Sequence, residues 1–190
     1  MRRLTASLLA CVTGMSLAIA SCSGDNGADD TAANGDATVS PPETVAATAA
    51  AENHAAQFLT DAMKGDNSEV RVGRLAVENG SSKGVRDFGQ MLVMDHGKAK
   101  EQVVQVALAM NVPATDDTLP EADAVYTRLQ ALSGADFDKE FVAAMIEDHR
   151  KDIDKFEQEA GSGDPAQVTD LARQTVPTLR KHLETAQSLQ

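Results

Sequence analysis

A short element of this chain occurs twice and contains residues that can bind a metal ion. Phenylalanine, six further residues, aspartate and histidine follow one another in residues 88–96 and again in residues 141–149. Imidazole nitrogen and carboxylate oxygen are ligands that proteins offer to zinc, iron and manganese. The repeat can therefore supply a metal site if the fold brings its two copies together.

Each histidine of the repeat stands on the apolar face of a predicted helix. Over about residues 83–111, apolar residues recur every three or four positions, which predicts an amphipathic helix with His96 in the middle of its buried face. A second predicted helix, over about residues 137–160, has His149 at an equivalent place. Imidazole is thus expected where a helical protein normally keeps aliphatic side chains.

Glu69 and His182 extend this candidate cluster. Glu69 interrupts the apolar stripe of a helix predicted over about residues 52–79, and His182 lies beside the stripe of the last predicted helix. Counting from the helix ends places Glu69, His96 and His149 at nearly the same height. His182 is expected roughly one and a half turns away, about 9 Å at the helical rise. His54 is expected to be an exposed residue near a helix end.

The order of helices predicts an all-α fold. Four long amphipathic helices are joined by two short turns and by one long connection, residues 112–135, which contains a short helix over about residues 121–132. This order is typical of a ferritin-like four-helix bundle with a crossover between its second and third long helices. Because the crossover returns the chain to the end where the second helix begins, those two helices are expected to run parallel.

Several motifs occur in an order that resembles a known family. They are Ser68-Glu69-Val70 to Leu75-Ala76, Val85-x2-Phe88 to Asp95-His96, Gly134-Ala135-Asp136-Phe137-Asp138, Met145-x2-Asp148-His149 and Leu179-x2-His182-Leu183. Together they span nearly all of the folded part and resemble the family called domain of unknown function 4142. The resemblance implies a ferritin-like helical domain of exported bacterial proteins, often labelled outer-membrane proteins, with no established activity.

The N-terminus predicts export and lipid attachment. Two arginines precede an uncharged apolar stretch that ends at Ala20, which is the pattern of a secretory signal. Ser21-Cys22 follows as in a bacterial lipobox, so residues 1–21 are expected to be removed and Cys22 to be lipidated; an ordinary signal cleaved near Ala20 is the alternative. Since Cys11 lies within the signal, no free thiol would remain for a disulfide or a cysteine enzyme.

Composition divides the mature chain into a tether and one domain. Residues 22–50 contain no aromatic residue and no Lys or Arg, so they are expected to form a disordered tether, and residues 51–190 to form the domain. A formal net charge of −12 argues against nucleic acid as a partner. The expected partners are a membrane, through the lipid, and another envelope protein. Ser23 follows Cys22, and because an Asp at this position would favour the inner membrane, Ser23 favours an outer-membrane anchor that faces the periplasm. The oligomeric state is left open.

One interpretation of the cluster is a site for a single divalent transition metal. The candidate ligands, direct or as hydrogen-bond partners of a ligand, are Glu69, His96, His149, His182, Asp95 and Asp148. An Asp next to a His can accept the N–H of a histidine on another helix. Met145 and other methionines would add soft ligands for copper. A di-iron centre is not predicted, because Val93, Ile146 and Leu179 stand where such centres have Glu three residues before His.

The other interpretation is a buried polar cluster that fixes helix register through hydrogen bonds or ordered water. A heme or small-ligand pocket is a third. The sequence contains no hydrolase elbow, phosphate loop or dinucleotide fingerprint, so no catalytic residue is predicted. The sequence favours a lipid-anchored envelope protein with a structural or interaction role. The alternative function is metal binding for sequestration or stress protection.

Overall fold

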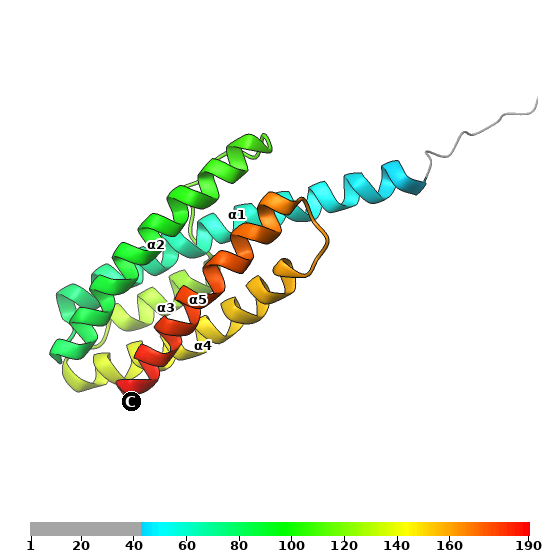
Figure 1. Cartoon of the computed structure of the whole chain (residues 1–190). Coiled ribbons are helices and arrows are strands. Elements are labelled where there is room, and N and C mark those ends of the chain that lie inside the picture. Colours follow the sequence, from blue (N-terminus) through cyan, green and yellow to red (C-terminus); the bar gives the residue numbers. More distant parts are fainter. Residues whose placement is uncertain (1–42) are drawn as a thin grey trace, which may run out of the picture. The chain divides into compact units, whose positions relative to one another are not determined.

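The described part of the chain folds into α-helices. The computed structural model describes residues 43–190, in which five helices and no strands occur (Figure 1). The helices are α1 (Glu43–Asn79), α2 (Lys83–Ala109), α3 (Pro120–Gln130), α4 (Gly134–Ala160) and α5 (Ala166–Ser188). The predicted all-α class is confirmed, and the short helix α3 lies in the connection between α2 and α4.

Helix α1 begins earlier than the sequence predicted. It starts at Glu43 rather than near residue 52, so the last part of the predicted tether is helical. This segment is rich in alanine, which has the highest helix propensity, whereas the prediction relied on its lack of large apolar side chains. The predicted signal, Cys22 and the rest of the tether lie outside the described residues. No helix within residues 43–190 is long and apolar enough to cross a membrane.

Helices α1 and α2 approach each other closely after a capped turn. Ser82 caps α2, because its hydroxyl oxygen accepts a hydrogen bond of 3.2 Å from the backbone N–H of Val85. Farther along the pair, a Cβ atom on Gly73 would lie only 2.8 Å from the carbonyl oxygen of Gly89. These two glycines therefore allow the close backbone approach that brings Glu69 towards α2.

Helices α2 and α4 begin at the same end of the domain and run parallel, as predicted (Figure 1). The Asp138 carboxylate, early in α4, accepts hydrogen bonds of 2.7 Å from the backbone N–H groups of Ser81 and Ser82, just before α2. At the other end, Nδ1 of His54 in α1 lies 2.7 Å from the carboxylate of Asp164, just before α5. Both ends of the helix set are thus fixed by side-chain contacts.

A layer of polar side chains divides the apolar core into two. One apolar cluster includes Phe58 and Leu179, and the other includes Phe88 and Phe141. Between them, each long helix contributes at least one buried polar residue, and these residues are Asp66, Ser68, Glu69, His96, His149 and His182. Every long helix therefore gives up apolar contacts at the same level of the core.

Candidate metal centre

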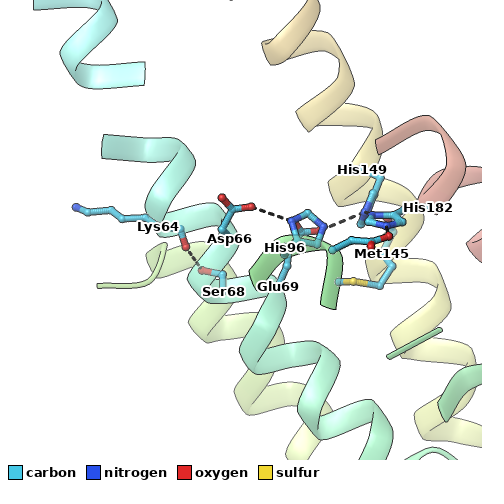
Figure 2. Close-up of polar contacts among 9 residues, drawn as sticks. Lys64, Asp66, Ser68, Glu69, His96, Met145, His149 and His182 are labelled. Carbon is cyan, nitrogen blue, oxygen red and sulfur yellow. Dashed lines mark hydrogen bonds and ion pairs between the residues drawn. The ribbon is translucent and has the colours of Figure 1, made fainter. Parts of the chain in front are cut away.

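Four polar side chains from four helices meet in this layer (Figure 2). Glu69 comes from α1, His96 from α2, His149 from α4 and His182 from α5, and their exposed fractions are 3%, 4%, 0% and 0%. Each imidazole offers one nitrogen, and these three nitrogens all lie within 4.8 Å of one another. Such burial is costly unless the polar atoms find partners.

The position of His182 differs from the sequence prediction. Its ring centroid lies 5.1 Å from that of His96 and 5.2 Å from that of His149, so it belongs to the layer itself. The prediction counted residues at the helical rise, but residues 161–165 between α4 and α5 are not helical. The height of α5 relative to α4 depends on this connection, which a residue count does not describe.

A backbone carbonyl fixes the tautomer of His149. Its Nδ1 lies 3.0 Å from the carbonyl oxygen of Met145, which can only accept, so Nδ1 carries the hydrogen. In the neutral ring, Nε2 then presents a lone pair. Burial lowers the pKa of His149, although Glu69 opposes this effect, and the neutral ring is therefore favoured at neutral pH.

Asp95 fixes the tautomer of His182. Nε2 of His182 donates to the Asp95 carboxylate at 2.9 Å, so that Nδ1 of the neutral ring presents a lone pair. Burial lowers the pKa of His182 to about 4, although the bond to Asp95 opposes it. The predicted pairing of an Asp with a histidine on another helix is found here, since Asp95 belongs to α2 and His182 to α5.

The lone pairs of these two rings face each other. Nε2 of His149 lies 3.2 Å from Nδ1 of His182, and neither neutral ring has a hydrogen to place between them. Oε1 of Glu69 lies 3.3 Å from the same Nε2 and has no hydrogen-bond partner among the described residues. Three electron-rich atoms therefore meet, which is unfavourable unless a proton or a metal ion lies between them.

His96 contacts carboxylates through one nitrogen only. Its Nδ1 lies 2.9 Å from Asp66 and 2.9 Å from Glu69, whereas its buried Nε2 has no partner within the described part of the chain. Burial opposes the charged ring, but Glu69 and Asp66 raise the pKa of His96 well above its usual value. Burial likewise opposes ionisation of Glu69, but His96 and His149 lower its pKa to about 2. Without a metal, His96 is therefore the cation of the layer.

Sequence reasoning missed two carboxylates beside the layer, Asp66 and Asp152. Asp152 forms, with Glu69 and Asp148, a group whose carboxylate oxygens all lie within 4.8 Å of one another. Burial raises the pKa of Asp66 to about 6, and burial together with Glu69 raises that of Asp148 to about 7. The available signal was helical spacing, because Asp66 lies three residues before Glu69 and Asp152 three residues after His149.

The histidine side of the layer has the donor set of a transition-metal site. Three imidazole nitrogens and one carboxylate suit zinc or ferrous iron. The hydrogen bonds to Met145 and Asp95 hold two of the rings in one orientation, as partners of metal ligands commonly do. Asp148, predicted as a candidate ligand, is grouped with carboxylates rather than with the imidazoles.

Comparison with known proteins agrees with the resemblance seen in the sequence. A solved structure titled "Crystal structure of DUF305 fragment from Deinococcus radiodurans" shares the fold, with a TM-score of 0.64 and 17% identity over 71% of this chain and 93% of that one. No curated protein matches the chain. The family model for the domain of unknown function DUF4142 matches residues 40–189. The chain therefore belongs to the DUF4142 family.

Proposed function

We propose that this protein binds one divalent transition-metal ion, zinc or ferrous iron, between His96, His149 and His182, with Glu69 as a further ligand. The observation that carries the proposal is the 3.2 Å contact between two nitrogens whose tautomers leave only lone pairs on both sides. A metal ion would use these lone pairs, and it would also give a partner to the buried Nε2 of His96 and Oε1 of Glu69.

A structural module without metal is the second candidate. It is favoured by the two carboxylates on Nδ1 of His96, which stabilise an imidazolium ion. This state leaves a buried Glu69 oxygen and a buried His96 nitrogen without partners, each of which costs about 1–3 kcal/mol. The metal-bound state removes both costs, and we therefore favour it.

The biological setting that we propose is a lipid-anchored domain of the bacterial envelope. The lipobox ending in Cys22 supports lipid attachment, and Ser23 after it supports an outer-membrane anchor that faces the periplasm. Four long helices with a crossover between α2 and α4 support a ferritin-like four-helix bundle. In that setting, sequestration or delivery of the metal is the proposed role, and we assign no catalytic residue.

Zinc binding to the full chain, produced without a polyhistidine tag and freed of metal with a chelator, tests the proposal. Isothermal titration is expected to show one zinc ion bound with high affinity. The affinity should fall at least tenfold in His149→Gln, because this variant loses one nitrogen ligand. His54→Gln is the matched control, because this histidine lies outside the layer. Equal zinc affinity in wild type and a folded His149→Gln protein, or no zinc binding at all, would overturn the metal site.

A further inference from the structure

Three carboxylates meet beside the histidine layer, and only one of them, that of Glu69, contacts a positively charged side chain, His96. Glu69, Asp148 and Asp152 bring carboxylate oxygens within 4.8 Å of one another. The basic residues that line the neighbouring hollows pair elsewhere. Nζ of Lys151 binds Glu147 at 2.7 Å, Nε of Arg128 binds Glu140 at 2.6 Å, and Nζ of Lys155 lies 3.7 Å from Asp61. Among the described residues, neither Asp148 nor Asp152 makes a hydrogen bond or an ion pair.

Glu69 belongs both to the histidine layer and to this carboxylate group, and one of its oxygens is unsatisfied. Its side chain is almost fully buried. Oε2 contacts His96 at 2.9 Å, whereas Oε1 lies 3.3 Å from Nε2 of His149 and has no hydrogen-bond partner in residues 43–190. A buried carboxylate beside two further carboxylates is disfavoured unless a proton or a cation lies among them. The group therefore contains a buried ligand residue with an unsatisfied oxygen, together with a local excess of negative charge.

The surroundings of the group offer both space and access. A small cavity of about 20 Å³ is lined by Glu69 and Asp152, and about one water molecule or ion fits such a volume. A larger hollow of about 230 Å³, lined by Glu69, Asp148 and Glu121, opens between α1, α3 and α4. An ion can thus reach the carboxylates from outside without passing the imidazoles.

We propose that Glu69, Asp148 and Asp152 form a second cation site, which takes a hard divalent ion such as manganese, magnesium or calcium. Oxygen-only ligands suit these ions, whereas the imidazoles on the other side of Glu69 suit zinc or ferrous iron. The inference deepens the proposed function, because Glu69 is shared between the two sites. The ligands of the two sites do not follow the Glu-x-x-His arrangement of di-iron proteins.

Manganese is the probe for this site, because bound and free Mn²⁺ are distinguished by electron paramagnetic resonance. The full chain is first given one equivalent of zinc and is then titrated with manganese. Wild type is expected to bind one manganese ion, and Asp152→Asn to bind it at least tenfold more weakly with little change in zinc affinity. Asp154→Asn, an exposed carboxylate on the same helix, is the matched control and should behave as wild type.

The outcomes separate the two sites. If zinc does not bind, the same titration of the metal-free protein still shows manganese that is lost in Asp152→Asn, and only the histidine site fails. If Asp152→Asn and Asp154→Asn bind manganese equally, or wild type binds none at millimolar concentration, the carboxylate site is overturned. Asp148→Asn repeats the test with a second ligand, and circular dichroism establishes that each variant is folded.

Discussion

At the scale of single residues, the layer is defined by where hydrogens can be placed. Met145 and Asp95 each hold one nitrogen of a histidine as a donor, which turns the other nitrogen of each ring into an acceptor. One cation placed between the two acceptors and Glu69 would satisfy all three. Replacement of one acceptor by an amide should therefore change zinc affinity more than the loss of an exposed histidine does.

The pH dependence of Asp148→Asn measures the charge crowding in the metal-free protein. The pKa of Asp148 is raised to about 7, so the folded state binds a proton that the unfolded state releases near pH 3.8. The carboxyl therefore lowers stability as the pH rises between these values. Relative to wild type, the free energy of unfolding of Asp148→Asn should increase up to about pH 7, by at most about 1.4 kcal/mol per pH unit, and then level off.

Chemical denaturation of both proteins with a chelator present, at several pH values from 4 to 8, measures this difference. Addition of manganese at pH 7.5 should reverse the order of stability, since only wild type keeps the full carboxylate site. A difference that does not change with pH would contradict the assignment of the crowding to Asp148.

At the scale of secondary-structure elements, the distance between α1 and α2 is set by two glycines. A Cβ atom on Gly73 would lie 2.8 Å from a backbone oxygen of α2, and one on Gly89 would lie 2.7 Å from a backbone oxygen of α1. Backbone atoms cannot move aside as a flexible side chain can. The approach of Glu69 on α1 to His96 on α2 therefore depends on positions that bind nothing themselves.

Gly73→Ala is expected to separate the two helices and to weaken the site. The clash should lower the free energy of unfolding by about 1–3 kcal/mol and should also reduce zinc affinity. Gly97→Ala is the matched control, because a Cβ atom there meets nothing within 4 Å and alanine favours helix. Thermal or chemical unfolding together with zinc titration measures both effects, and equal behaviour of the two variants would contradict the role of Gly73.

At the scale of the whole domain, the ends of the helix set are fixed by contacts remote from the layer. His54, which the sequence placed as an exposed end residue, has a side chain that is 56% exposed, yet its Nδ1 lies 2.7 Å from Asp164. This contact joins α1 to the connection before α5, the helix that carries His182. It therefore contributes to the placement of α5.

The contribution of His54 should depend on pH in a defined direction. The hydrogen bond to Asp164 raises the pKa of His54, so its stabilisation is fully present below pH 6.5 and is lost as the pH rises through the raised value. His54→Gln should therefore lower the free energy of unfolding more at pH 5.5 than at pH 8.5. Denaturation of the metal-free proteins at the two pH values measures this, and an equal loss at both would refute the ion pair.

Much of this architecture follows from the sequence because helical periodicity is local. The apolar stripes defined four long helices, and the same stripes identified His96, His149 and Glu69 as buried polar residues. The DUF4142 motifs identified the family, which the family model confirms. The early start of α1 was missed, because the alanine-rich segment after residue 43 has helix propensity without an apolar stripe.

Only the tertiary structure decided which of these side chains share a site. The place of His182 depends on the non-helical connection before α5, and the approach of Asp152 to Glu69 depends on how α4 is rotated against α1. The tautomers depend on partners such as Asp95. These are relations between elements far apart in sequence, and periodicity within one helix carries no information about them. The sequence thus identified Glu69, His96 and His149 as buried polar residues, and packing decided which other side chains join them and that their lone pairs meet.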